Sequence, residues 1–262
     1  MSVAGRPVDS EPREAVKVTN RNGASPYVII CEHASNFIPV DYGALGLEEV
    51  ELSRHIAWDP GALPVAGMLA EALDAPLVAS TVSRLVIDCN RPLDAPDLVP
   101  ETSETTVIPD NRGLDQAARA ERVAISHQPF HAVLDELVTA RLAAGRAAWL
   151  VTIHTFTPVY RSVPRPWHVG ILHDADERLA GPMIAAFGRL DGVVVGDNQP
   201  YSPADRVYYT LERHGRSRGL PCAMVEIRND GVGDADGQRL WAERLAAILA
   251  DIEAAGLSEM AA

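Results

Sequence analysis

The sequence of 262 residues lacks the features that point to export or to a membrane. It has no apolar run of about eighteen residues or more, so it predicts no transmembrane helix. Its first residues, MSVAGRPVDSEPREAVKV, carry charges where a signal peptide needs an apolar core, so we expect no export. Its three cysteines, Cys31, Cys89 and Cys222, form no CxxC pair and lie in or beside apolar runs. This usage favours reduced, buried thiols in a cytoplasmic protein.

The sequence is also short of positive charge. Lys and Arg number 23 against 36 Asp and Glu, which gives a net charge of −13 with neutral histidines. This balance argues against non-specific binding to nucleic acid or to an anionic membrane. It leaves room for a local basic pocket, and we expect a small anionic molecule as the partner. The sequence does not predict the oligomeric state.

Apolar runs typical of strands alternate along the chain with segments of helical spacing. This alternation predicts an α/β sandwich with a mostly parallel sheet. We find no internal repeat and no linker, and predict one domain over residues 26–262 after a loosely held segment at 1–25. The expected strands are 26–31, 76–79, 84–88, 149–153, 166–172, 193–195 and 222–227. The expected helices are 60–74, one or two within 114–145 broken near Pro129, 176–190, 204–216 and 235–256, with a long loop at 92–113.

Polar residues follow several of these strands, at the edge where α/β sheets bind their ligands. A random scatter of polar residues would not favour that edge. Carboxylates, imidazoles, amides and guanidinium groups are all present among them. In chain order they are Glu32, His33, Asp88, Asn90, Arg91, His154, Asn198, Glu226 and Arg228.

Two histidines in this set predict a metal site. A catalytic zinc site needs three nitrogen or oxygen ligands, an open position for water and a carboxylate to accept the water's proton. His33 and His154 are two candidate ligands, and Asp59, before the expected first helix, is the candidate third. Glu226 is the candidate base. Each has an ordinary alternative: Asp59 could cap the helix, Glu226 could pair with Arg228, and the histidines could be hydrogen-bonded strand-end residues.

The remaining histidines are weaker candidates. One of them, His214, lies in a polar stretch and could contact substrate, but its spacing favours a solvated loop histidine. The others lack a strand end with a polar cluster as strong as that of His33 or His154: His55, His127, His131, His168 and His173.

Six motifs together resemble the N-formylglutamate amidohydrolase family. They lie in order across residues 26–250 and are CEHASNFIP, WDPGA, SRLVIDCNRP, IHTFTP, GDNQPYSP and VEIRND. The resemblance implies a phosphorylase/hydrolase-like, three-layer α/β fold shared with zinc exopeptidases. It implies Zn²⁺ or another divalent metal as the cofactor. The implied reaction is cleavage of the amide of N-formylglutamate or a related N-acyl acidic substrate, in amino-acid catabolism.

The motif SRLVIDCNRP also resembles the substrate clamp of aspartoacylase-type enzymes. Carried over, Arg84, Asn90 and Arg91 hold carboxylate and amide groups of the substrate, since a planar guanidinium suits a carboxylate. Arg84 would also help to stabilise the tetrahedral oxyanion, unless it is simply a surface charge. The predicted substrate-binding residues are Asn36, Asn90, Arg91, Asn198 and Arg228.

The sequence departs from the related enzymes at one ligand. Zinc carboxypeptidases and aspartoacylases place His-x-x-Glu at the end of the first strand, whereas the same spacing here gives His33 and Asn36. A neutral amide is a poor zinc ligand, and Asp59 resembles the position used by zinc-dependent muramoyl-alanine amidases. We therefore rank Asp59 above Asn36 as the third ligand. Two alternative functions are a deacylase or peptidase with another acyl substrate and a catalytically silent module that binds a small anion.

Overall fold

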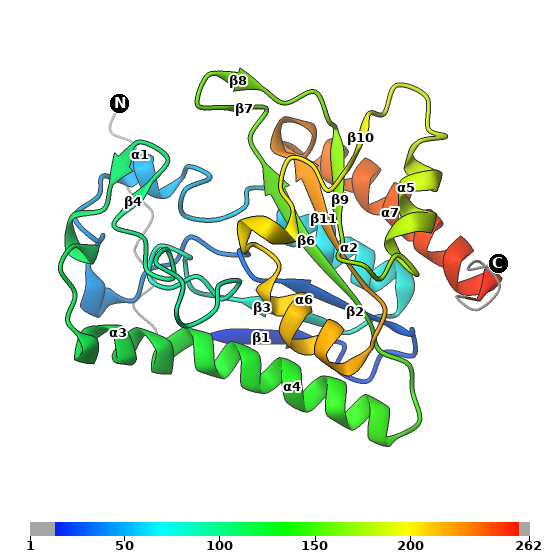
Figure 1. Cartoon of the computed structure of the whole chain (residues 1–262), viewed down its shortest axis with the longest axis horizontal. Helices are drawn as coiled ribbons and strands as arrows, with labels where there is room; N and C mark the ends of the chain where they lie inside the picture. The colour runs from blue at the N-terminus through cyan, green and yellow to red at the C-terminus, as the bar shows by residue number, and fades with distance from the viewer. Residues whose placement is uncertain (1–13, 257–262) are drawn as a thin grey trace.

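The computed structural model describes residues 14–256, which are built around one mixed sheet (Figure 1). Pairing is parallel from β3 through β2 and β6 to β11 and again between β9 and β10. Only the β1–β3 and β11–β9 pairs of this sheet are antiparallel. The mostly parallel sheet that the sequence predicts is therefore confirmed. In spatial order its seven strands are β1 (Val16–Thr19), β3 (Leu77–Ser80), β2 (Tyr27–Cys31), β6 (Trp149–Phe156), β11 (Cys222–Arg228), β9 (Val169–Leu172) and β10 (Val195–Asp197).

Helices cover both faces of the sheet and complete the three layers (Figure 1). One hydrophobic cluster joins the sheet to α2 (Ala62–Leu73), α5 (Ala180–Phe187) and α7 (Ala235–Ala255). A second cluster on the other face includes side chains of α4 (Gln128–Ala143) and α6 (Tyr209–His214). Because both faces are covered, β2 is apolar and buried along its whole length rather than alternating.

A third hydrophobic cluster lies in the loops beside the sheet and contains little regular structure. Two short helices border it, α1 (Glu49–Leu52) and α3 (Gln116–Arg122). The predicted strand at 84–88 is wrong, because this stretch forms turns. The amide of Leu85 donates to the Ser83 hydroxyl at 3.1 Å, and the amide of Val86 donates to the Ser83 carbonyl at 3.0 Å. The apolar run is buried in the loop cluster instead of pairing with a neighbouring strand.

Several predicted boundaries also need correction. The segment predicted as loosely held includes β1, which pairs with β3; residues 1–13 lie outside the described residues. The predicted break near Pro129 is a π-helical segment, Val123–His127, that joins α3 to α4 without interruption, and the proline falls in the first turn of α4. The helix expected at 204–216 is confined to α6, after a short 3₁₀ turn.

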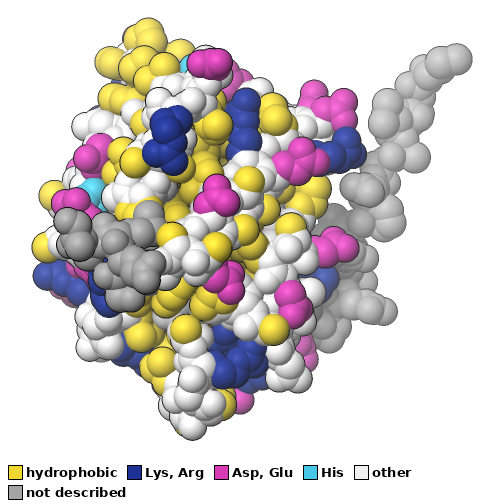
Figure 2. Space-filling model, turned by 90° about the vertical axis from the view of Figure 1, so that its right-hand side faces the viewer, with side chains coloured by type: hydrophobic (Ala, Val, Ile, Leu, Met, Phe, Trp, Pro, Cys, Tyr) yellow, Lys and Arg dark blue, Asp and Glu magenta, His cyan; other side chains and the backbone are white. Residues whose placement is uncertain are grey.

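None of the helices within residues 14–256 is both long enough and apolar enough to cross a bilayer. Acidic, basic and apolar side chains are interspersed across the face shown in Figure 2. On this face the negative charge of the chain is spread out rather than gathered in one patch.

Candidate active site

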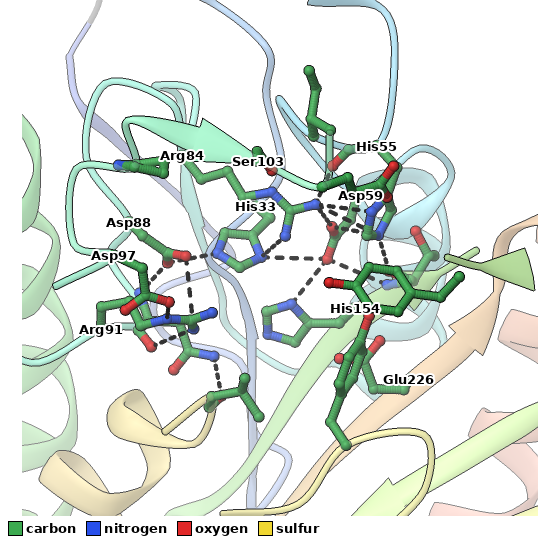
Figure 3. A pocket seen from close by; sticks show the side chains of 18 of the residues that line it. His33, His55, Asp59, Arg84, Asp88, Arg91, Asp97, Ser103, His154 and Glu226 are labelled. Carbon is green, nitrogen blue, oxygen red and sulfur yellow. Dashed lines mark hydrogen bonds and ion pairs between the residues drawn. The ribbon is translucent and has the colours of Figure 1, made fainter. Parts of the chain in front are cut away.

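Three buried side chains from separate segments meet at the carboxyl end of the parallel strands (Figure 3). His33 follows β2, His154 lies in β6 and Asp59 lies three residues before α2. One nitrogen of each imidazole and one oxygen of Asp59 lie within 4.8 Å of one another. None of the three side chains is more than 4% exposed. We call this set, which the sequence predicts as the metal ligands, the ligand cluster.

Backbone contacts fix Asp59 within the ligand cluster. Its amide donates to the carbonyl of His33 at 2.9 Å, and its Oδ2 accepts from the amide of Thr155 at 3.3 Å. The same oxygen lies 2.9 Å from Nδ1 of His154. The residue before α2 is Gly61, with φ of 85°, and no side chain caps this helix. The alternative role of Asp59 as a helix cap is therefore wrong.

Each histidine of the ligand cluster is held on its far side by a second carboxylate. Nε2 of His33 lies 2.7 Å from Asp88, and Nε2 of His154 lies 3.0 Å from Glu32. Both Nδ1 atoms face Asp59, at 3.4 Å and 2.9 Å respectively. Outer carboxylates of this kind orient a ligand imidazole and select its tautomer. The sequence places Glu32 and Asp88 at the site edge, but no role was predicted for either.

These charged neighbours shift the titration of the ligand cluster. Burial acts to lower the pKa of His154, yet the carboxylates of Glu32 and Asp59 raise this pKa well above its usual value. Burial acts to raise the pKa of Asp59, yet the Arg84 guanidinium and the two histidines hold this pKa well below its usual range. The surroundings of the ligand cluster thus favour protonated His154 and ionised Asp59.

The donor set fits a divalent metal of the zinc type. Two imidazole nitrogens and a carboxylate oxygen are ligands that catalytic zinc sites use, with a further position left open. Nη1 of Arg84 donates towards Nδ1 of His33 at 3.2 Å. As an acceptor from Arg84, Nδ1 of His33 carries no proton, so the proton of a neutral imidazole lies on Nε2, beside Asp88. A bound cation would take the place of the proton that His154 shares with Asp59.

The ligand cluster opens into a cavity of about 410 Å³. Such a volume suits a small molecule. Two hairpins contribute to its walls, through Thr102 and Ser103 on one side and Tyr160 and Arg161 on the other. The strands of these hairpins are β4 (Thr102–Ser103), β5 (Thr106–Val107), β7 (Val159–Tyr160) and β8 (Val163–Pro164).

Glu226 reaches the same cavity from β11. It pairs in parallel register with His154 and is 5% exposed, and its Oε2 has no hydrogen-bond partner among the described residues. Burial raises the pKa of Glu226 to about 7, against the opposing charge of His154. Arg228 pairs with Asp230 at 2.8 Å, so the alternative ion pair with Glu226 is wrong. A buried carboxyl group with a near-neutral pKa can act as a general base.

Two predicted arginines line the cavity, but both are already paired with carboxylates. Arg84 lies 2.8 Å from Asp59, is 17% exposed and donates to two backbone carbonyls, so it is not a surface charge. Arg91 lies 2.8 Å from Asp97 and 3.7 Å from Asp88. In this arrangement Arg84 holds Asp59 of the ligand cluster, and Arg91 is bound to the protein's own carboxylates.

Three predicted substrate-binding residues lie outside the lining of this cavity and bond to other parts of the protein. Asn36 donates to the carbonyl of Leu52 at 2.9 Å through its side-chain amide nitrogen. Asn198 accepts from the amide of His173 at 3.0 Å. Arg228 is held by its ion pair on the neighbouring turn. These side chains stabilise loops, and the local sequence pattern gives no sign of that.

Asn90 lines the cavity and also fixes its wall. Its side chain donates to the carbonyl of Val207 and accepts from the amide of Thr210 at 3.0 Å. His55, considered a weak candidate from the sequence, lies 3.3 Å from Asp59 and belongs to the site. It does not follow a strand, so the argument from strand ends misses it. The cavity also contains residues to which the sequence assigned no role: Asp97, Tyr160, Arg161 and Tyr201.

The fold and the site define a three-layer α/β protein with a candidate metal centre at the carboxyl ends of its parallel strands. A model of the N-formylglutamate amidohydrolase family matches residues 25–232, and the chain belongs to this family. The resemblance inferred from the six motifs is therefore confirmed, and membership supports a hydrolase. No curated protein matches the chain.

Two solved structures are similar to the chain. A gene product from Agrobacterium tumefaciens shares 43% sequence identity, with a TM-score of 0.91 over 93% of this chain and 96% of that one. The N-formylglutamate amidohydrolase from Ralstonia eutropha JMP134 shares 21% identity, with a TM-score of 0.64 over 92% of this chain and 98% of that one. The second likeness shows a common fold.

Proposed function

We propose that the protein is a metal-dependent amidohydrolase that cleaves a small N-acyl amino acid, N-formylglutamate or a related N-acyl acidic compound. The observation that carries this proposal is the convergence of His33, Asp59 and His154 beside the unpaired carboxyl of Glu226 in one cavity. The family match supports the same reaction class. Zinc or another divalent metal held by the ligand cluster would polarise the amide carbonyl and acidify the attacking water.

The protein's own groups then move the protons. Glu226 takes a proton from the attacking water and delivers it to the leaving amine nitrogen, because its carboxyl lines the cavity and its pKa lies near neutrality. Arg84 keeps Asp59 ionised and in place. Glu32 and Asp88 hold the two ligand histidines with Nδ1 directed inward.

Turnover of N-acyl amino acids with and without metal tests this proposal. The purified protein is stripped with a chelator and assayed on N-formylglutamate, on other N-formyl amino acids and on N-acetyl analogues. We expect turnover of an N-acyl acidic substrate, loss of activity on stripping and recovery on addition of Zn²⁺. A chelator saturated with Zn²⁺ serves as the control.

Two outcomes would contradict it. Hydrolysis that persists in fully stripped protein would remove the metal from the mechanism. Metal-loaded protein that turns over none of the substrates, yet binds them, would favour the catalytically silent anion-binding module.

A further inference from the structure

One arginine that lines the cavity forms no ion pair with a carboxylate of the described residues. Three arginines line it: Arg84, Arg91 and Arg161. The first is paired with Asp59 and the second with Asp97. Within residues 14–256, Arg161 forms no ion pair with a carboxylate. The available positive charge of the cavity therefore lies on the side of the β7–β8 hairpin, not on the side of the predicted clamp.

The hairpin turn fixes where Arg161 lies. Arg161 and Ser162 have φ angles of 48° and 65° and form the two-residue turn between β7 and β8. Such turns need positive φ at both central residues and bring the strands close together. The Arg161 guanidinium lies 5.3 Å from the ring of Tyr160, which also lines the cavity. The turn thus holds an exposed cation at the cavity rim.

A second arginine lies behind the same wall and also lacks a carboxylate partner among the described residues. Arg165 is 8% exposed, and its guanidinium lies 4.7 Å from the rings of both Tyr160 and Tyr201 and 5.7 Å from that of Phe156. It donates to the Tyr201 hydroxyl at 3.0 Å and to the carbonyl of Thr157 at 3.5 Å. A buried guanidinium without an anion is unfavourable, so this wall favours the arrival of a negative charge.

Tyr201 connects this buried charge to the cavity. Because Arg165 donates to its hydroxyl oxygen, the hydroxyl proton is directed to a different acceptor. Burial and Glu226 raise the pKa of Tyr201 to about 12, so the hydroxyl remains a donor at neutral pH. The loop before Tyr201 packs directly on β9 at Gly170, where a Cβ atom would collide with the carbonyl oxygen of Gln199. The donor is therefore held in a fixed position.

We propose that Arg161, Arg165 and Tyr201 form the subsite for the side-chain carboxylate of an N-acyl acidic amino acid. Arg161 and the Tyr201 hydroxyl contact the carboxylate, and Arg165 orients and polarises that hydroxyl from behind. This assignment deepens the proposed function and rests on it. It replaces Arg91 as the main determinant of acidic-substrate specificity.

The depth of the groups indicates which carboxylate binds there. The ligand cluster is buried, whereas Arg161 is exposed at the rim. In an N-acylglutamate the α-carboxylate is attached one carbon from the scissile nitrogen and must stay near the ligand cluster. The side-chain carboxylate extends further from the amide, towards the rim. The subsite therefore recognises the side-chain carboxylate of the substrate.

A pair of isosteric substrates tests the subsite. N-formylglutamate and N-formylglutamine differ only in the charge and donor pattern of the side-chain end. We expect Arg161→Gln to lower kcat/KM for N-formylglutamate by about tenfold to a hundredfold, mainly through KM. The same substitution should change kcat/KM for N-formylglutamine by less than about threefold. Tyr201→Phe should act in the same direction by about threefold to thirtyfold. Bound metal should match wild type in both variants, and Tm should match wild type in Arg161→Gln.

Two further variants complete the design. Arg165→Met should cause the same selective loss as Tyr201→Phe; where it fails to fold, the exposed Arg161 and the Tyr201 hydroxyl still carry the test. Arg239→Gln is the matched control, because Arg239 pairs with Asp236 on α7, outside the cavity lining.

The outcomes separate the subsite from the reaction. Equal losses for both substrates, or no loss in Arg161→Gln, would overturn the subsite while leaving the amidohydrolase intact. Metal-loaded wild type that turns over neither substrate would overturn the proposed function and the subsite together. A selective loss for the acidic substrate, with metal content unchanged, supports the subsite.

Discussion

The histidines of the ligand cluster are surrounded by more carboxylates than ordinary buried histidines need. His33 contacts both Asp59 and Asp88, and His154 contacts both Asp59 and Glu32. Without a metal, protons on the imidazoles must balance this negative charge. A dication in the ligand cluster would displace protons, so metal binding is expected to release them. Under the proposed function the outer carboxylates would therefore contribute to metal affinity, although neither is assigned as a ligand.

Loss of either outer carboxylate should weaken metal binding. We expect Glu32→Gln and Asp88→Asn each to lower zinc affinity by about tenfold to a hundredfold, because an amide orients the imidazole less firmly and makes it less basic. Competition with a chelator of known affinity measures the change. The matched control is Glu104→Gln, since Glu104 lines the cavity but pairs with Arg54. Unchanged affinity in both outer variants would contradict this role.

Glu226→Gln should separate the base from the metal site. The substitution keeps the shape and removes the basicity, so kcat should fall by at least about a hundredfold. Zinc content should stay at the wild-type level, because Glu226 is outside the ligand cluster. Tm should change little, because no ion pair of Glu226 is lost. A large fall in Tm with near-normal kcat would show a structural role and remove Glu226 from the mechanism.

Among the secondary-structure elements, the junction of α3 and α4 positions the loop that carries the predicted clamp. His127 bonds to the carbonyl of Arg91 at 3.0 Å, and His131 bonds to the carbonyl of Cys89 at 2.9 Å. The π-helical segment ends at His127, and such segments are frequent near functional sites. His131 is in turn bonded to His214 of α6 at 2.9 Å. Two helices thus brace a loop that also supplies one of the outer carboxylates.

This junction should make stability sensitive to acid. His214 is fully buried, and burial together with the charge of Arg213 lowers its pKa from 6.5 to about 4. In the unfolded chain His214 is protonated below about pH 6.5, whereas in the folded protein it is protonated only near pH 4. The contribution of His214 to stability is therefore lost as the pH falls from about 6.5 towards 4. Between about pH 7 and pH 5 the loss should be about 2 kcal/mol of unfolding free energy.

The variant His214→Gln isolates that contribution. Its amide can still donate to His131 but does not titrate, so its stability should fall less than that of wild type over the same pH range. Denaturant unfolding at each pH provides the free energies. Parallel curves for the two proteins would show that His214 is not the titrating group.

The apolar run at 84–88 shows why one element could not be predicted from its pattern. An apolar run bounded by polar residues indicates that the run is buried. It does not show whether the run is buried in a sheet or in a cluster of loops. Here Ser83 supplies turn hydrogen bonds that replace a ladder. By contrast, the strands expected at 26–31, 149–153 and 222–227 are present. Helices cover both faces of the sheet at these strands, so each strand is a continuous apolar run that the sequence shows clearly.

In the whole molecule, the sequence predicted the ligand cluster better than the surrounding pocket. The carboxyl ends of parallel strands share one edge, so His33, His154 and Glu226 could be placed together from their positions alone. Ion-pair partners could not be predicted in the same way. The packing of the loops pairs Arg91 with Asp97 and leaves Arg161 without a carboxylate partner among the described residues. The spacing of residues in the sequence does not predict that packing.

The central claim is that His33, Asp59 and His154 hold the metal on which hydrolysis depends. The most direct test is metal content per chain after equilibration with zinc, measured with activity and circular dichroism on the same samples. Wild type and Asn36→Ala should retain about one equivalent. Asp59→Asn and His154→Ala should lose the metal and the turnover of N-formylglutamate together while remaining folded. A full equivalent of zinc in folded Asp59→Asn or His154→Ala would contradict the account.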